Sequence, residues 1–288
     1  MHNRSRTIWI AAIVSLAFAG ILLHPAARTR FGWFASGIRS ESVREQVYAL
    51  TGPQPEAWVR EIVFPETEPT SRSREVYFDA PTETCEEFSA YVFFLPPGET
   101  PLQPHKHVED ELIVPIESQL DVLTTDSRGP LTEHVGTGKV VFNAAEQTHA
   151  ISRLSDERAS YLVLKWKSRD PKPFDAALGS AVFDIHKLHR HQLKGEQRPF
   201  KADTIFEGAT RSLKKLHSHA STLAPGAGYP AQEDPIDIAI VLLRGEVETL
   251  GQKATAPAVF FYPAGRPHGL RNVGVDPAQY VVFEFHGR

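Results

Sequence analysis

Two similar blocks of β-type sequence follow one another along this chain of 288 residues. Leu95–Gly98 in the first block matches Leu223–Gly226 in the second, and the run that starts at Tyr161 matches the run that starts at Tyr280. Both blocks consist of short apolar or alternating runs separated by Gly, Pro, Asn and Asp, a pattern typical of strands and tight turns. The simplest account is a duplicated all-β unit of about 80 to 90 residues. A small closed barrel or a double-sheet jelly roll suits that size and protects strand edges.

The predicted strands are unevenly distributed. In the first block they are Phe88–Leu95, Glu111–Leu123, Lys139–Phe142 and Tyr161–Trp166, and the strand pattern resumes from Ser212 to Phe285. The segment between the blocks contains several prolines, so we expect a connector there with at most one short strand. Before the first block, Ser40–Leu50 has a capping-type start and apolar positions at helical spacing, which predicts a short helix.

Composition excludes several classes of function. The 31 basic and 35 acidic residues give a net charge of −4, and no Lys/Arg run outside the N-terminus resembles a phosphate-tracking surface, so nucleic acid is not an expected partner. The single cysteine, Cys85, excludes an intrachain disulfide and a four-cysteine zinc site.

The N-terminus predicts export from the cytoplasm. Arg4 and Arg6 precede an uncharged apolar run, Ile8–Leu23. Its 16 residues exceed a typical signal-peptide core and fall just short of the roughly 20 that span a bilayer. We favour an uncleaved hydrophobic helix that anchors the chain with its remainder in the periplasm or outside the cell, and cleavage near Ala19 with secretion is the alternative.

A set of metal-ligand residues lies in the first block. His105-x-His107-x3-Glu111 is followed 38 residues later by His149. In an extended chain His105 and His107 point the same way about 7 Å apart, so one ion can take both. Glu111 is an even number of residues beyond His107 and can return to that face. The four side chains therefore predict a mononuclear metal site.

These motifs resemble the cupin superfamily, whose first motif is G-x5-H-x-H-x3,4-E-x6-G and whose second is G-x5-P-x-G-x2-H-x3-N. The first block carries all four ligands, but its turn residues differ: Ser118 occupies the closing Gly position of the first motif, and Ala144, Glu146 and Arg153 replace the Pro, Gly and Asn of the second.

The second block shows the opposite pattern. Gly226 and Gly245 frame its first motif, while Gln232, Asp234 and Ile238 stand at three of the ligand positions, and Pro263, Gly265, His268 and Asn272 follow the second motif. The resemblance thus implies two tandem cupin (double-stranded β-helix, or jelly-roll) barrels, with metal in the first and a degenerate site in the second. The expected domains are residues 1–30, signal anchor or signal peptide; 31–74, N-terminal extension; 75–168, cupin domain 1; 169–208, connector; and 209–288, cupin domain 2.

Two further groups of residues are weaker candidates. Glu109 and Asp110 lie beside Glu111, where one of them could act as a general base or both could form an acidic surface cluster, and Arg153 could pair with an anionic substrate. In the second barrel, His217, His219, Gln232, Asp234 and His268 could line a ligand pocket.

The resemblance leaves two functional hypotheses open, because cupin folds support many activities. The first is a membrane-anchored, extracytoplasmic enzyme of oxygenase or isomerase type with one divalent Fe or Mn ion, acting on a small oxygenated molecule; Zn and Ni also fit the ligands. The second is a non-catalytic module of the cell envelope that binds carbohydrate or another small ligand. Cupin-like barrels often pair through edge strands, so the resemblance also allows a homodimer.

Overall fold

The structure of the protein is a computed structural model that describes residues 56–67, 69–98, 102–126, 129–153, 157–169, 175–188 and 200–287. The predicted hydrophobic helix and the predicted helix at 40–50 lie outside these residues. The described residues form an all-β fold whose one helical element is the 3-10 turn η1 (Ile185–Lys187). None of their helices is long and apolar enough to cross a membrane.

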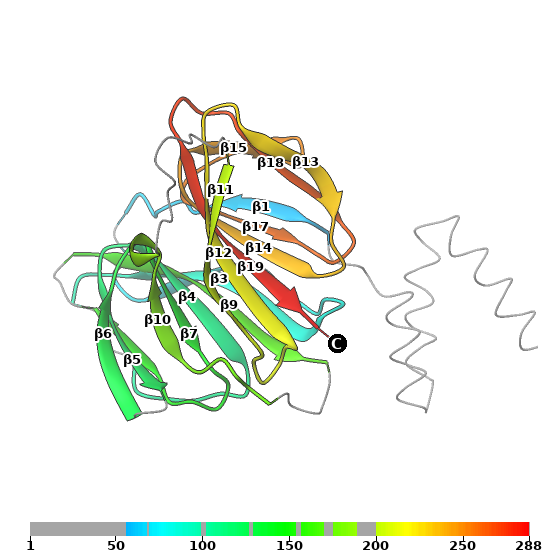
Figure 1. The fold of residues 1–288 in the computed structure, drawn as a ribbon. Helices are drawn as coiled ribbons and strands as arrows, with labels where there is room; N and C mark the ends of the chain where they lie inside the picture. The colour runs from blue at the N-terminus through cyan, green and yellow to red at the C-terminus, as the bar shows by residue number, and fades with distance from the viewer. Residues whose placement is uncertain are drawn as a thin grey trace, which may run out of the picture. The chain divides into compact units, whose positions relative to one another are not determined.

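Two large antiparallel sheets and two small ones make up the fold (Figure 1). The first large sheet has the order β10-β7-β4-β9-β3-β2. It shares an apolar core with a separate three-stranded sheet, β6-β5-β8. The strands of both are β2 (Ser73–Ala80), β3 (Cys85–Leu95), β4 (Asp110–Glu117), β5 (Leu120–Asp126), β6 (Gly129–Val135), β7 (Lys139–Asn143), β8 (Ala150–Arg153), β9 (Ala159–Ser168) and β10 (Ala181–Asp184). We call these two sheets the N-terminal barrel.

The C-terminal barrel repeats this arrangement. Its large sheet has the order β1-β17-β14-β19-β12-β11, and its small sheet the order β13-β18-β15-β16. The strands are β1 (Trp58–Glu61), β11 (Phe200–Gly208), β12 (Lys215–Leu223), β13 (Gly228–Glu233), β14 (Asp237–Arg244), β15 (Glu246–Thr249), β16 (Gln252–Thr255), β17 (Ala258–Tyr262), β18 (Pro267–Asn272) and β19 (Ala278–His286).

The segments expected as extension and connector contribute strands to the sheets. The connector forms two strands, β10 and β11, where we expected at most one. β1 precedes the first repeat in the sequence but pairs with β17 of the C-terminal barrel, and β10 precedes the second repeat but pairs with β7 of the N-terminal barrel. Each repeat thus gives its first strand to the other barrel, and Glu56–Arg288 forms one compact unit.

The two large sheets pack against each other through a shared apolar core. Alternation along each strand sends one set of side chains into this core and the next set into the barrel. In β3, for example, Phe88 faces the other barrel and Phe93 faces its own barrel. The shared core includes Phe88, Val92, Leu112, Leu164 and Trp166 from one barrel and Ala239, Val241, Phe261, Phe283 and Phe285 from the other.

Aromatic rings dominate the centre of this shared core. The ring of Phe88 lies 4.7 Å from that of Phe261 and 5.1 Å from that of Phe285, between ring centroids, and Trp166 lies 5.0 Å from Phe285. Such pairs add to the hydrophobic free energy of burial, so they fix how the barrels meet.

Two buried carboxylates bridge the same boundary. Asp110 accepts a hydrogen bond from the hydroxyl of Thr210 (2.7 Å) in the C-terminal barrel, and Asp237 accepts one from the hydroxyl of Thr82 in the N-terminal barrel. Each threonine also accepts a backbone N–H three residues later, from Leu213 and Cys85 respectively. Each barrel therefore contributes one aspartate and one threonine to these bonds, just as each repeat contributes one strand to the other barrel.

The turn positions at which the first block departs from the cupin motif keep the motif's backbone conformation. The predicted strand Glu111–Leu123 is two strands, broken where Ser118 adopts φ 61°, and Gly245 at the matching position has φ 91°. Glu146 has φ 63°, and its counterpart Gly265 has φ 71°. Non-glycine residues rarely adopt this left-handed conformation, so the turns are held by their surroundings.

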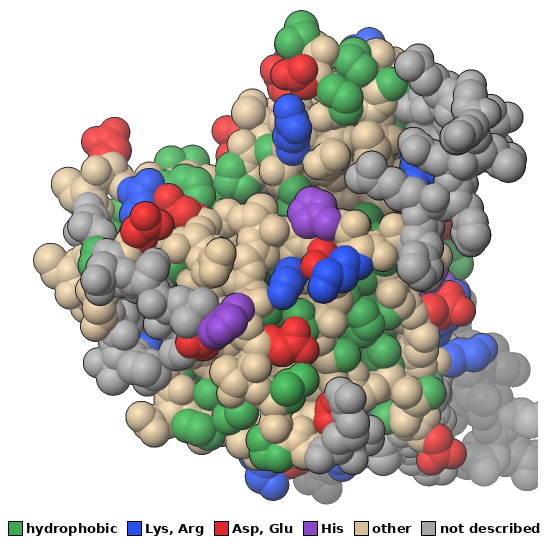
Figure 2. All heavy atoms as spheres, turned by 60° about the vertical axis from the view of Figure 1, so that its left-hand side comes forward, with side chains coloured by type: hydrophobic (Ala, Val, Ile, Leu, Met, Phe, Trp, Pro, Cys, Tyr) green, Lys and Arg blue, Asp and Glu red, His purple; other side chains and the backbone are tan. Residues whose placement is uncertain are grey.

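Charged side chains of both signs lie close together on the surface. Figure 2 shows a face on which Lys/Arg and Asp/Glu side chains are neighbours among apolar and backbone surface. The ion pair between Arg158 and Glu117 (3.0 Å) is one example from the described surface. Exposed pairs of this kind contribute little to stability, so the apolar cores determine the fold.

We expect Phe88→Ala to lower the free energy of unfolding by about 3 to 5 kcal/mol, because a fully buried ring is replaced by a cavity. Phe88 contacts rings of both barrels, so calorimetry should show a single transition at a lower temperature. The control is Val63→Ala at a side chain that is 68% exposed, where the change should stay within about 0.5 kcal/mol. Two separate transitions, with one unmoved by Phe88→Ala, would contradict a shared core.

Candidate metal centre

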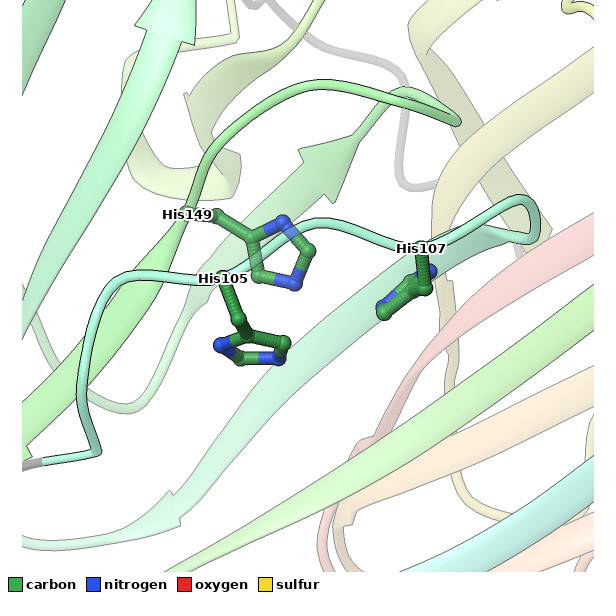
Figure 3. A group of neighbouring side chains, drawn as sticks. All are labelled: His105, His107 and His149. Carbon is green, nitrogen blue, oxygen red and sulfur yellow. The ribbon is translucent and has the colours of Figure 1, made fainter.

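Three of the predicted ligands, His105, His107 and His149, lie together in the N-terminal barrel (Figure 3). His105 and His107 belong to the segment that leads into β4, and His149 directly precedes β8. His105 and His149 form an isolated antiparallel bridge, with backbone N–H to carbonyl distances of 3.0 and 2.9 Å. Within the His-x-His segment only His105 pairs with another strand-like residue, and His107 lies outside the assigned strands. Instead the backbone carbonyl of His107 accepts the N–H of Glu146 (2.7 Å).

All three imidazoles are oriented in the same way. The Nδ1 of His105 bonds to the carbonyl of Gln103 (3.0 Å), that of His107 to the carbonyl of Glu109 (3.0 Å), and that of His149 to the carbonyl of Gln147 (2.9 Å). A carbonyl only accepts, so each Nδ1 carries the proton and each Nε2 keeps its lone pair. This is the tautomer that binds a metal through Nε2.

Glu111 faces the same space from β4. Its two oxygens lie 3.6 Å from the Nε2 of His107 and 3.4 Å from the Nε2 of His149. The side-chain amide of Asn143 donates a hydrogen bond to Glu111 (3.0 Å), which fixes the carboxylate. The carboxylate contacts His107 and His149, and it lies outside the group of three histidines whose ligand atoms are all within 4.8 Å of one another.

The charge states in this group suit a metal. Burial alone would raise the pKa of Glu111, but the interactions with His107 and His149 and the Asn143 hydrogen bond outweigh it and lower the pKa. Burial lowers the pKa of His149, which keeps the imidazole neutral. A neutral imidazole and an ionised carboxylate are the forms that bind a cation.

Two orphaned atoms test whether a metal fits. The Nε2 atoms of His107 and His149 are buried and have no hydrogen-bond partner. Leaving a buried polar atom unpaired costs about 1 to 3 kcal/mol, so both atoms require an explanation. The three histidines offer ligand atoms within 4.8 Å of one another, and an ion at their centre would satisfy them. The residues therefore fit a divalent first-row metal.

The neighbouring carboxylates differ in role. Asp110 is fully buried, so its interpretation as part of a surface cluster is wrong. Besides its bond to Thr210, it accepts the backbone N–H of Ala145 (2.9 Å) in the turn before His149. Burial raises the pKa of Asp110, and these donors act in the opposite direction. Asp110 therefore positions the His149 loop.

Glu109, two residues before the candidate ligand Glu111, lines a small cavity whose lining includes none of the four candidate ligands. The cavity has a volume of about 190 Å³, and Arg74, Ser89, Tyr91 and Lys165 also line it. Lys165 forms an ion pair with Glu109 (3.4 Å). The third sequence candidate, Arg153, ends β8, and its side chain lies outside what the structure describes.

The candidate pocket of the second barrel divides into two groups. Asp234 contacts Gln232 (3.3 Å) and His268 (3.2 Å), and the Nδ1 of His268 bonds to the carbonyl of Arg266 (3.3 Å), as in the His149 turn. His217 and His219 instead lie near Glu284.

Asn143 and Glu284 belong to these groups although neither residue was predicted from the sequence. Asn143 directly precedes the turn of the second motif, and its counterpart in the other repeat is Tyr262, so neither motif nor repeat singles it out. Glu284 is an isolated carboxylate in an apolar strand, and such a charge in a buried strand is itself an indication of a partner.

Comparison with solved structures identifies the fold. A putative glyoxylate-induced protein from Pseudomonas aeruginosa has a TM-score of 0.56 and 12% identity over 77% of this chain and 83% of its own. AerE from Microcystis aeruginosa gives 0.55 and 10% over 80% and 97%, and a cupin 2 conserved barrel domain protein from Leptotrichia buccalis gives 0.52 and 9% over 77% and 92%. No protein-family model and no curated protein sequence matches the chain. The structure thus confirms the expected architecture: the chain has the cupin fold, with two barrels in one compact unit.

Proposed function

We propose that the N-terminal barrel binds one divalent transition metal through His105, His107, His149 and Glu111. The observation that carries this proposal is the shared orientation of the three imidazoles, each held through Nδ1 with Nε2 directed into one space. Fe and Mn are the favoured ions, and Zn or Ni also suits three imidazoles and a carboxylate.

We further propose that the chain is a metal-dependent enzyme of oxygenase or isomerase type. A bound metal would supply a Lewis acid for a carbonyl or hydroxyl oxygen of the substrate. The cavity of about 190 Å³ that Glu109 lines has room for a small oxygenated molecule. Its lining combines the cationic Arg74 and Lys165 with the carboxylates of Asp79 and Glu87.

The chain's own residues can move a proton in that cavity. Glu109, which forms an ion pair with Lys165 (3.4 Å), is the carboxylate that can accept a proton from the substrate. Burial raises the pKa of Tyr91, so its hydroxyl stays protonated and can donate a hydrogen bond. These residues would orient a substrate and act as base next to the metal.

We expect His107→Ala and His149→Ala each to remove one equivalent of metal, because each deletes a ligand. Asn143→Ala should weaken binding by about 10- to 100-fold, since it frees the Glu111 carboxylate. Elemental analysis of untagged, dialysed protein and competition with a chelator measure both effects. His134→Ala is the matched control, because His134 is an exposed histidine of β6 that pairs with Asp121 of β5. If His107→Ala contained as much metal as the unaltered protein, the proposed metal site would be wrong.

We expect Glu109→Gln to retain the metal and to lower turnover by about 10²- to 10⁴-fold, because it removes the base and leaves the ligands intact. The assay is a panel of sugar acids, keto acids and phenols, with and without oxygen. Fully loaded protein that turns over none of them would contradict the enzyme proposal. Carbohydrate binding that survives metal removal and depends on Gln232 and Asp234 would favour the non-catalytic alternative.

We also propose that the barrels act outside the cytoplasm, anchored by the apolar run Ile8–Leu23. Carbonate extraction of bacterial membranes and protease treatment of spheroplasts test this. The full chain should stay with the membrane and be digested from outside, because a hydrophobic anchor resists carbonate, and deletion of residues 1–30 should give protease-protected, soluble protein. Protease protection of the full chain would contradict the proposal, and release of a shortened chain would indicate cleavage.

A further inference from the structure

The C-terminal barrel contains a second group of metal-ligand side chains, away from the cupin motif positions. His217 and His219 project from β12, and Glu284 projects from the adjacent strand β19, where it is directly opposite His217. His219 is opposite Val282, whose side chain belongs to the interior core of this barrel. All three side chains thus lie on the inward face of the large sheet.

The three side chains are close enough to share an ion. Each offers one ligand atom within 4.8 Å of the others, and the two imidazole rings are 5.5 Å apart between centroids. All three residues are half-buried. Ligand atoms around an ion lie about 3 to 4 Å apart because each bond is about 2.1 Å long, so side-chain shifts of about 1 Å close the group.

A carboxylate outside the group orients one of the histidines. Glu207 on β11 bonds to the Nδ1 of His217 (2.8 Å), which leaves the Nε2 of that ring free for a ligand bond. Lys215 contacts Glu207 (3.4 Å) and holds it in turn. A histidine backed by a carboxylate is the arrangement common among metal ligands, because the carboxylate fixes the tautomer and increases the basicity of the ring.

The repeat shows which residues occupy this position in the other barrel. By the matched runs at Leu95 and Leu223, and at Tyr161 and Tyr280, the counterparts of His217, His219 and Glu284 are Ser89, Tyr91 and Lys165. These three residues line the small cavity that also contains Glu109. The same position therefore holds a lysine in one barrel, which repels cations, and two imidazoles with a carboxylate in the other.

A larger cavity, about 1050 Å³ in volume, is lined by two neighbours of this group. They are Glu207 and His286, which contact His217 and Glu284 respectively, whereas the three ligand side chains do not line the cavity themselves. The motif residues Gln232, Asp234 and His268 are not members of the group.

We propose that His217, His219 and Glu284 form a second divalent metal site, independent of the first. Two imidazoles and one carboxylate select Zn²⁺, Fe²⁺, Co²⁺ or Ni²⁺ over the hard cations Ca²⁺ and Mg²⁺, which prefer oxygen ligands. Glu207 is a positioning residue for His217.

The test uses the full chain carrying His107→Ala and His149→Ala, so that the first site is disabled. Titration with Co²⁺, followed by its visible absorption, should show one equivalent bound, and Zn²⁺ should displace it while Ca²⁺ should not. Adding His217→Ala, His219→Ala or Glu284→Gln should abolish that equivalent, and Glu207→Gln should weaken it by about 10- to 100-fold. His134→Ala in the same background is the control and should change nothing. Thermal melts show that each variant is folded.

The outcomes separate this proposal from the proposed function. Loss of one equivalent with His217→Ala in the otherwise unaltered chain supports the second site whether or not the first site binds. The proposal of a second site is overturned if the unaltered chain binds one equivalent of metal that His149→Ala removes and His219→Ala retains. That result leaves the first site intact. Cobalt binding that survives all three ligand substitutions also overturns it.

Discussion

The contact between the two large sheets determines how the rest of this protein is built. Each large sheet is apolar on both faces because one face fills a barrel and the other fills the shared core. The exchange of β1 and β10 between repeats adds backbone pairing across the same boundary. Neither repeat can complete its large sheet without a strand from the other, so the described chain behaves as one folding unit.

Asp110 connects this contact to the metal centre. One of its oxygens accepts the hydroxyl of Thr210 across the boundary, and the other accepts the backbone N–H of Ala145 in the turn before His149. The next residue, Glu111, points into the barrel. Two consecutive residues at the start of β4 therefore fix the sheet contact, the His149 loop and the candidate carboxylate ligand together. Asp237 makes the same two kinds of bond in the C-terminal barrel, to Thr82 and Ala264.

The sequence predicted the fold class, the duplication and the residues that the structure gathers at the first centre, because motif spacing and strand alternation are local properties. It could not predict that β1 and β10 pair with the opposite barrel, since pairing between distant segments leaves no local pattern. It also misjudged Asp110: a charged residue beside two other acids is typical of a surface, and only its partners 35 and 100 residues away explain its burial. The N-terminal prediction falls outside the described residues.

The two barrels show why the motif frame can survive the loss of its ligands. The turn before His268 keeps the bonds of the turn before His149: Gly265 N–H to the carbonyl of Asp234, and Ala264 N–H to Asp237. None of these bonds involves a ligand side chain. The frame is therefore held by backbone groups and by the carboxylate at the sheet contact, which leaves the inward-facing side chains free to change. In the N-terminal barrel these side chains include the candidate ligands His105, His107, Glu111 and His149. The C-terminal barrel keeps only His268 at the motif positions and carries two further histidines, His217 and His219, on β12.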